Sequence, residues 1–239
     1  SRVERVLSDL VRSDVDVVEA VGKHTLEAGG KRLRPAFVLM SARACDPSAT
    51  LDRAVRLGAC LEMIHMATLI HDDVIDHAAL RRGRPTAASV FGNSASILSG
   101  DVLLARAMTI LADDGDLDII RTVSAAVVQM AEGEALEVQY RDLFDLSIDQ
   151  HLRVLDMKTA RFVDCCCRVG ACAVGGSTEA IEALASYGRH LGLAFQIVDD
   201  LLDYRGRQDT TGKPRATDFR EACATLPLLL LREELTEEE

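Results

Sequence analysis

Tryptophan is absent from the 239 residues, and aromatic residues make up only 4% of the chain. Sheets of β-sandwiches and barrels are usually rich in Tyr, Trp and Phe, so this scarcity argues against an all-β fold. Proline occurs five times, which suits long, uninterrupted helices. Because 48% of the residues are hydrophobic, the composition excludes disorder and predicts an all-α globular protein.

Cysteine frameworks and targeting segments are also missing. The seven cysteines form no C-x-x-C pair, and three of them are consecutive at 165–167. Consecutive helical side chains point about 100° apart, so these three cannot jointly hold a metal. The N-terminus lacks the apolar core of a signal peptide, and no run of about eighteen apolar residues occurs. We expect reduced thiols in a soluble, cytoplasmic protein that still makes a peripheral membrane contact.

Positive charge is scarce as well. The chain has 27 Lys and Arg against 38 Asp and Glu, a formal net charge of −11 at pH 7. No long basic run offsets this charge, so the chain as a whole repels a phosphate backbone. Nucleic acid is therefore excluded as a partner.

Apolar residues recur at helical spacing along most of the chain. No segment alternates like a strand, and no break in composition divides domains. Loops are predicted over 77–86 and 205–217, and apolar residues resume over 226–231. The predicted helices span residues 2–28, 35–44, 51–76, 94–111, 117–140, 147–174 and 178–204.

The pentad D-D-x-x-D occurs twice, each time after an apolar helical stretch. Residues i and i+4 lie about 40° apart around a helix, so Asp72 shares a face with Asp76, and Asp199 with Asp203. Stacked carboxylates repel one another unless a cation lies between them, and oxygen donors favour Mg²⁺, which often completes its shell with substrate phosphates. One pentad alone would indicate a solvated acidic helix end. Two predict a phosphate-bearing ligand held between two helices.

Two tight groups of basic residues stand out in this acidic chain. They are Lys31, Arg32 and Arg34 after a Gly-Gly break, and Arg81, Arg82 and Arg84 after the first pentad. Arginine binds phosphate oxygens through paired hydrogen bonds, so both groups suit a diphosphate. Two further residues are ambiguous: Lys158 fits a surface lysine in an apolar helix, and His65 fits a core histidine.

Together these motifs resemble the trans-polyprenyl diphosphate synthases, over about 29–227 of the chain. F-G-N at 91–93 and S-G-D at 99–101 resemble the long-chain branch, whose products feed quinone side chains. The resemblance implies an isoprenoid synthase fold, a bundle of long antiparallel helices around a deep central cavity, usually as a homodimer. The motifs are G-G-K-R-L-R-P (29–35), L-I-H-D-D-V-I-D (69–76), R-R-G-R-P-T (81–86), K-T-A (158–160) and F-Q-I-V-D-D-L-L-D (195–203).

The resemblance implies a prenyltransferase that condenses isopentenyl diphosphate head-to-tail onto an allylic diphosphate by Mg²⁺-assisted ionisation. It implies three Mg²⁺ per active site, held by Asp72, Asp73, Asp76, Asp199, Asp200 and, through water, Asp203. The implied allylic diphosphate contacts are Arg81, Lys158, Thr159, Gln196 and Lys213. The implied isopentenyl diphosphate contacts are Lys31, Arg34, His65 and Arg82. The implied catalytic residues are Asp72, Asp73, Asp76, Lys158, Asp199 and Asp200.

The chain departs from the family pattern after the second pentad. Ala216 and Ala222 replace family glycines, and Cys223 replaces a lysine whose diphosphate contact is lost or supplied by Arg215 or Arg220. Family members also continue for several helices beyond this chain. We expect residues 1–239 to be a single polyprenyl synthase domain that lacks its C-terminal helices.

Product length is predicted from the helical turn before the first pentad. Ala67 and Thr68 are small, whereas short-chain enzymes commonly have bulky residues there, so we expect an all-trans product longer than geranylgeranyl. Small residues in a helix also have a plain packing interpretation.

Other functions remain open at this stage. One is a short-chain farnesyl or geranylgeranyl diphosphate synthase, and another is a non-catalytic subunit of a heteromeric synthase, although both pentads are intact. A terpene cyclase shares the metal chemistry, but it lacks the second diphosphate site that the 29–35 motif and Arg82 imply.

Overall fold

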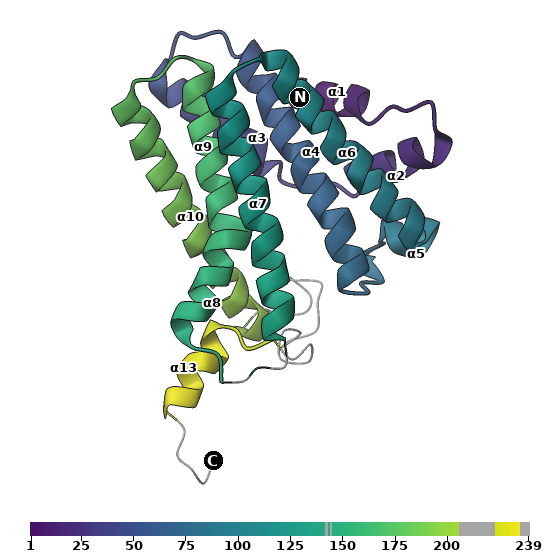
Figure 1. The fold of residues 1–239 in the computed structure, drawn as a ribbon, viewed down its shortest axis with the longest axis vertical. Helices are drawn as coiled ribbons and strands as arrows, with labels where there is room; N and C mark the ends of the chain where they lie inside the picture. Colours follow the sequence, from purple (N-terminus) through teal and green to yellow (C-terminus); the bar gives the residue numbers. More distant parts are fainter. Residues whose placement is uncertain (142, 144, 206–222, 235–239) are drawn as a thin grey trace. The chain divides into compact units, whose positions relative to one another are not determined.

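The computed structural model describes residues 1–141, 143, 145–205 and 223–234, and apart from one short hairpin its regular elements are helices (Figure 1). The all-α prediction is therefore confirmed. The chain divides into two compact units, one of residues 1–121 and 166–184 and the other of residues 122–165 and 185–239. Each unit is described by itself.

The first unit is built around one long buried helix. Helix α4 (Asp52–Ile75) packs against α6 (Asn93–Asp114), α3 (Leu33–Cys45) and α1 (Arg2–Leu10). Its side chains from Leu57 to Ile64 are almost all excluded from solvent. Small residues allow close packing: a Cβ at Gly58 would lie 3.2 Å from Pro35, and one at Gly100 would lie 2.4 Å from the His71 ring. The predicted helix over 51–76 is thus the core of this unit.

The single helix predicted over 2–28 is wrong, because the structure contains α1 and a separate α2 (Asp16–Glu27). Ser13 lies in the break. Its amide donates to Glu19 Oε2 at 2.8 Å, and its hydroxyl accepts from the Val15 amide at 3.3 Å. Such side-chain bonds to the backbone compete with helical bonds, which explains the break despite the apolar spacing.

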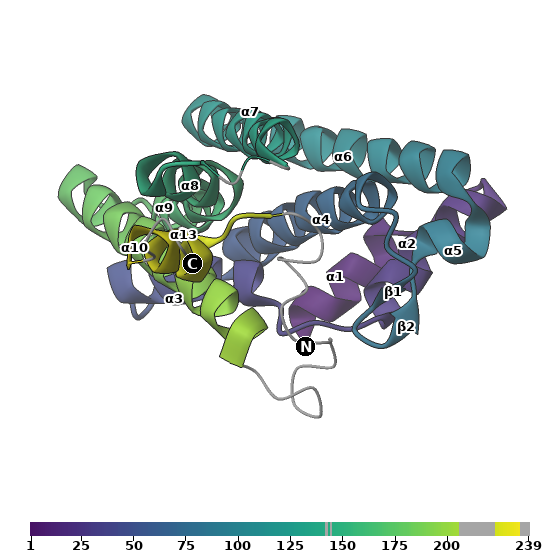
Figure 2. The same ribbon diagram turned by 90° about the horizontal axis from the view of Figure 1, so that it is seen from below.

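The loop predicted over 77–86 contains a tight antiparallel hairpin, which the sequence analysis missed. Strands β1 (Leu80–Arg81) and β2 (Arg84–Pro85) pair through a turn at Arg82 and Gly83, with φ of 54° and 74°. Two consecutive positive φ angles are typical of two-residue hairpin turns. Figure 2 shows the hairpin beside α2 and α5 (Ala87–Phe91), a short helix that was also not predicted.

The second unit contains the carboxyl-terminal part of α7 (Leu117–Tyr140) and most of α10 (Thr178–Arg205). The helix predicted over 147–174 is confirmed as helical, but it contains a π-helical turn, η1 (Asp156–Ala160), between α8 (Ile148–Leu155) and α9 (Arg161–Ala173). Ser147 and Gln150 form a capping box at its start, which sets where the helix begins. Helix α13 (Leu226–Glu234) packs on α8.

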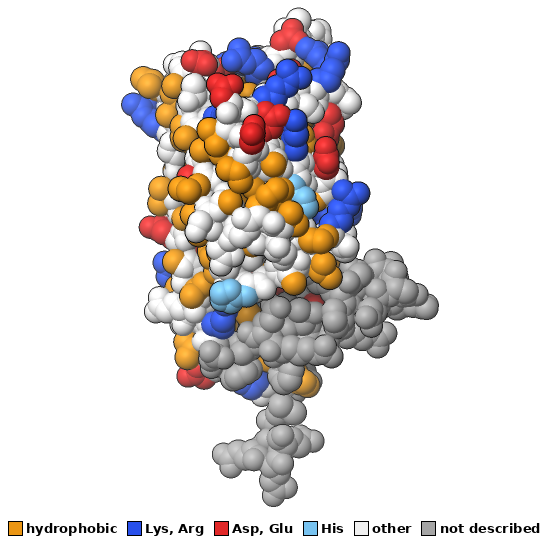
Figure 3. Space-filling model, turned by 90° about the vertical axis from the view of Figure 1, so that its right-hand side faces the viewer, with side chains coloured by type: hydrophobic (Ala, Val, Ile, Leu, Met, Phe, Trp, Pro, Cys, Tyr) orange, Lys and Arg blue, Asp and Glu red, His pale blue; other side chains and the backbone are white. Residues whose placement is uncertain are grey.

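Helix α6 is, among the described helices, the single one long and apolar enough to cross a membrane by length and composition. The core helix of a globular protein passes the same test, and α6 has a buried side that includes Ser96, Leu103 and Ala107. Its Ile97 and Leu98 are 41% and 62% exposed. Figure 3, which views the side where α2 and α5 lie in Figure 1, shows hydrophobic side chains gathered below charged ones.

Candidate functional site

The first aspartate pentad lies where α4 leaves the core. Asp72 and Asp73 belong to its last turn, and Asp76 is the C-cap residue, whose amide donates to the Asp72 carbonyl at 2.8 Å. Asp73 is 5% exposed and accepts a 2.6 Å hydrogen bond from Arg81 Nε. The structure thus brings Arg81, a predicted diphosphate contact, directly to the first pentad.

The Asp73 carboxylate is held in an unfavourable environment. Burial raises its pKa, the charge and hydrogen bond of Arg81 lower it, and the negative charge of Asp76 raises it, with a net rise above the ordinary value of 3.8. A bound cation would remove this penalty, because it favours the charged form of every carboxylate near it. The donor chemistry of the first pentad therefore fits a hard metal ion.

His65 lies on the same helix, seven residues before Asp72, and seven residues are almost two helical turns. Burial lowers its pKa well below 6.5, and the charges of four arginines lower it further. The arginines, in decreasing order of effect, are Arg34, Arg82, Arg81 and Arg32. His65 is thus half-buried rather than a fully buried core residue, and positive charge near it disfavours its protonation.

Arg34 is buried with an incomplete set of hydrogen bonds. Its Nε is excluded from solvent and has no hydrogen-bond partner. Burial lowers the pKa of its guanidinium, nearby Cys166 and Glu62 raise it, and the charge of Arg82 lowers it, with a net fall. A buried N–H group without a partner is costly, so an anion that accepts a hydrogen bond from Arg34 Nε would stabilise this place in the protein.

The hairpin carries Arg82 to the loop that precedes α3. Arg82 Nη1 donates to the Gly29 carbonyl, Arg84 Nη1 donates to the Glu27 carbonyl at 2.9 Å, and His24 Nε2 lies 2.8 Å from the Pro85 carbonyl. A Cβ at Gly30 would lie 2.8 Å from Arg82 Nη1, so a larger residue there would displace the end of the Arg82 side chain. The two basic groups of the sequence therefore meet in space, and Lys31 is exposed beside them.

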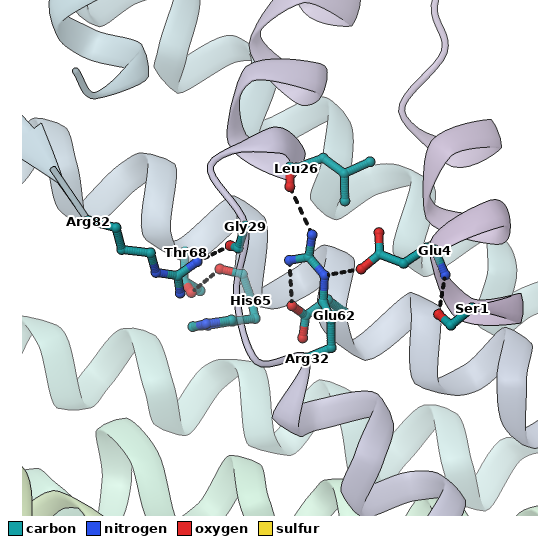
Figure 4. Close-up of polar contacts among 9 residues, drawn as sticks. All are labelled: Ser1, Glu4, Leu26, Gly29, Arg32, Glu62, His65, Thr68 and Arg82. Atoms are coloured by element: carbon teal, nitrogen blue, oxygen red, sulfur yellow. Dashed lines mark hydrogen bonds and ion pairs between the residues drawn. The ribbon is translucent and has the colours of Figure 1, made fainter. Parts of the chain in front are cut away.

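Arg32 differs from the other members of its basic group. Figure 4 shows its guanidinium directed toward Glu4 and Glu62, away from Arg82 and His65. The expectation that this side chain suits a phosphate is wrong, because it is already paired with carboxylates. No pattern in the sequence indicated this pairing, since Glu4 and Glu62 are distant from Arg32 along the chain.

The second pentad lies in the last turns of α10, in the second unit. Asp200 is 5% exposed, and its Oδ2 lies 2.8 Å from Nε2 of His151, which is 6% exposed. Asp199 is exposed and Asp203 is half-buried. His151 was not among the predicted site residues, because it belongs to no motif and lies 49 residues away from Asp200.

Lys158 is part of the π-helical turn η1 in the same unit. Its amine lies 2.8 Å from Glu134 Oε2 and also contacts Glu137. Burial lowers the Lys158 pKa, but the charges of Glu137 and Glu134 outweigh this and raise it above 10.5. The surface-lysine interpretation is wrong, since the side chain is held by two glutamates of α7. Their spacing, one helical turn apart, was the signal that could have identified them.

Thr159 and Gln196, both predicted as allylic diphosphate contacts, lie beside each other in the structure. The Thr159 hydroxyl donates to Gln196 Oε1 at 3.2 Å. This bond orients the amide toward the turn that carries Lys158. π-Helical turns often occur at functional sites. Lys213, the remaining predicted contact, lies outside the described residues, as do Arg215, Ala216, Arg220 and Ala222.

The structure distinguishes the two predicted chain-length residues. Ala67 is 2% exposed and belongs to the core. Thr68 is partly buried on the side of α4 that also carries His65 and Asp72, and its hydroxyl donates to the His65 carbonyl at 2.9 Å. Thr68 is thus the better placed of the two to meet a ligand.

Within the part of the chain that the structure describes, no three His, Cys, Asp or Glu side chains converge as a ready metal site. All seven cysteines are free thiols, as predicted. A metal ion held at either pentad would need oxygens from another source, such as water or a phosphate, to complete its shell.

Comparisons with known proteins agree with these motifs. Residues 15–239 match the family model described as polyprenyl synthetase. The all-trans-nonaprenyl-diphosphate synthase (geranyl-diphosphate specific) of Rhodobacter capsulatus is 40% identical over 227 residues, which are 95% of this chain and 69% of that protein. The octaprenyl diphosphate synthase of Escherichia coli is 37% identical over 95% of this chain and 70% of its own.

A solved structure is similar throughout. The polyprenyl synthase of Caulobacter crescentus, complexed with calcium and isoprenyl diphosphate, aligns with a TM-score of 0.94 and 40% identity. The alignment covers 99% of this chain and 72% of the Caulobacter chain.

Proposed function

The chain belongs to the polyprenyl synthetase family, and from this premise we propose that it is a trans-prenyltransferase. It condenses isopentenyl diphosphate head-to-tail onto an allylic diphosphate and forms an all-trans polyprenyl diphosphate longer than geranylgeranyl diphosphate. The names of the two relatives, an octaprenyl and a nonaprenyl synthase, support the long product.

The observation that carries this proposal is the cationic group around His65. Arg34, on α3, has a buried Nε without a partner. Arg82 reaches from the hairpin to the Gly29 carbonyl, in the loop just before α3. Arginine pairs well with phosphate oxygens, so Lys31, Arg34, His65 and Arg82 would hold isopentenyl diphosphate. His65 is neutral there and offers one N–H as a donor.

Each pentad would bind the metal ions that hold the allylic diphosphate. When bound, magnesium supplies positive charge that stabilises the departing diphosphate. In the first unit, Arg81 adds fixed positive charge beside Asp73. In the second unit, the proposed diphosphate contacts are Lys158, Thr159 and Gln196. Preorganised charge of this kind is most effective where charge develops during bond breaking. Loss of the diphosphate leaves an allylic cation, and the double bond of isopentenyl diphosphate attacks this cation to form the new C–C bond. A proton then passes from the condensed product to the released diphosphate, so no side-chain base is required.

The product tail would pass along the face of α4 that carries Thr68. Small side chains leave room there for a growing apolar chain, which needs surroundings without nucleophiles. We also propose a cytoplasmic homodimer that contacts membranes peripherally when it releases product. Exposed Val90, Ile97 and Leu98 on α5 and α6 support contacts with a second copy or a membrane, because exposed apolar patches commonly mark interaction surfaces.

Incubation with Mg²⁺, labelled isopentenyl diphosphate and farnesyl diphosphate tests the proposal. We expect label to move from the water-soluble substrate into an organic-soluble product, and we expect EDTA to abolish this transfer. Absence of transfer would refute the proposed activity. Transfer that requires an added second protein would support the heteromeric alternative.

A further inference from the structure

Arg32, the middle basic residue of the 29–35 motif, uses its whole guanidinium inside the protein. Nε donates to Glu4 Oε1 at 2.7 Å, and Nη1 donates to Glu62 Oε1 at 3.1 Å. Nη2 donates to the Leu26 carbonyl at 2.8 Å (Figure 4). The side chain is 16% exposed. Because every nitrogen already donates to an acceptor, Arg32 is not placed to bind substrate.

The backbone at Arg32 is as unusual as its side chain. Its φ is 49°, in the left-handed region, and the residue is the N-cap of α3. This conformation costs a residue other than glycine about 1 kcal/mol or more, so the surrounding contacts must maintain it. Arg32 lies between two predicted isopentenyl diphosphate contacts: Lys31 precedes it in the loop, and Arg34 follows it in the first turn of α3.

The loop 29–32 is fixed at two points. Arg82 holds the Gly29 carbonyl at one end, and Arg32 holds Leu26, Glu4 and Glu62 at the other. Glu62 is 3% exposed and precedes His65 by three residues on α4, so the two lie about one turn apart. Arg32 therefore connects the loop to the helix that carries His65.

Glu4 extends this connection to α1. That helix precedes residue 15, where the match to the family model begins. The Ser1 hydroxyl accepts the Glu4 amide at 3.2 Å, which caps α1 and fixes its first turn. Burial lowers the pKa of Arg32, but the hydrogen bonds and charges of Glu4 and Glu62 outweigh burial and raise the pKa above its ordinary value. The Arg32 guanidinium thus stays charged.

We propose that Arg32 is a positioning residue for the isopentenyl diphosphate site, and that Glu4 of α1 acts on this site through Arg32. This inference rests on the proposed function. It assigns α1 a specific role, which is to hold the loop of Lys31 and Arg34 in register with His65 on α4.

The test compares four variants of the full chain: Glu4→Gln, Arg32→Met, Arg32→Lys and the double variant of Glu4→Gln with Arg32→Met. Asp9→Asn is the matched control, because it removes one negative charge from α1 at an exposed residue whose ion pair with Arg12 is a 3.5 Å surface contact. The measurements are calorimetric binding of isopentenyl diphosphate, KM for each substrate, kcat and the thermal unfolding midpoint.

We expect Glu4→Gln to weaken isopentenyl diphosphate binding about two- to fivefold, as for a partly exposed ion pair. The KM of the allylic substrate should not change, and Asp9→Asn should behave like the original chain. Arg32→Met should weaken binding more than Arg32→Lys does. In the Arg32→Met background, Glu4→Gln should have no further effect, since contacts that act as one unit are not additive.

Several results would overturn the inference. One is that Glu4→Gln binds isopentenyl diphosphate as tightly as the original chain does. Another is that the KM values of both substrates rise equally across the variants, in proportion to the fall in the thermal unfolding midpoint. A full additional effect of Glu4→Gln on Arg32→Met would also contradict it. If the unmodified chain binds isopentenyl diphosphate but makes no product, the proposed activity fails, while the binding data still decide the role of Arg32. If the unmodified chain does not bind it, both fail.

Discussion

His65 has four arginines around it, and its protonation is opposed by both burial and positive charge. Because its pKa in the folded protein lies below 6.5, the unfolded chain binds the proton more tightly, and this lowers stability as pH falls below about 6.5. We expect the His65 imidazole to stay neutral at pH 6 by NMR, with its signal assigned through His65→Gln. The same variant should lose less stability than the original chain between pH 7 and pH 5. A His65 signal that titrates near 6.5 would contradict this.

Thr68 is the residue at which product length is best tested. Thr68→Phe places a bulky ring on the face of α4 that carries His65 and Asp72, so we expect shorter products by chromatography. Thr68→Val keeps the size and loses the hydroxyl, and it should leave product length unchanged. Ala67→Phe should instead lower stability by about 1 to 3 kcal/mol, since it overpacks a buried position. Identical products from Thr68→Phe and the original chain would refute this role.

At the residue scale, the sequence predicted the kinds of side chain in the site better than their partners. The roles of the pentads and of the predicted contacts stay predictions. The glutamates that pair with Arg32 and Lys158 were not predicted, because they belong to other helices: Glu4 and Glu62 pair with Arg32, and Glu134 and Glu137 pair with Lys158. Helical spacing indicates which side chains share a face of one helix, but it says nothing about which helix lies opposite.

Between α3 and α9, the elements approach so closely that glycine is required. A Cβ at Gly170 would lie 2.2 Å from the Val38 carbonyl oxygen, a distance that requires the backbone to move. We expect Gly170→Ala to lower the free energy of unfolding by about 1 to 3 kcal/mol, measured in urea. Gly22→Ala is the control, since its Cβ would meet the Val11 side chain at 3.1 Å and should cost less. Equal stability of the two variants would contradict this.

His151 ties α8 to the second pentad on α10. His151→Leu leaves the Asp200 carboxylate buried without this partner, so we expect a loss of about 3 kcal/mol in unfolding free energy. It should also raise the Mg²⁺ concentration needed for half-maximal activity. His151→Asn keeps a donor and should recover part of both effects, and His190→Leu, at an exposed residue, should change neither. If His151→Leu and His190→Leu give the same values in both measurements, the contact between His151 and Asp200 contributes neither to stability nor to the Mg²⁺ requirement.

At the element scale, long apolar helices were predictable and short elements were not. The helix over 51–76 matches α4 almost to the residue, because its periodicity extends over many turns. The break at Ser13, the hairpin at 80–85 and α5 depend on single side-chain bonds and on positive φ angles, which leave little trace in an apolar pattern.

For the whole molecule, the net charge of −11 argues against a nucleic-acid partner, but it hides the local arrangement of charge. The cations gather around His65 and Asp73, and the carboxylates gather in the pentads. A sequence can specify such sites through motifs because each motif occupies one or two helical turns. It cannot specify how the charges of distant helices neutralise one another.

The length of the product made from isopentenyl and farnesyl diphosphates with Mg²⁺ tests the central claim most directly. We predict one main all-trans polyprenyl diphosphate, longer than geranylgeranyl diphosphate, on reversed-phase chromatography after removal of the diphosphate. The product should be lost when Asp72 or Asp199 is replaced by Asn. A product that stops at geranylgeranyl, or no product from the folded protein, would contradict the account.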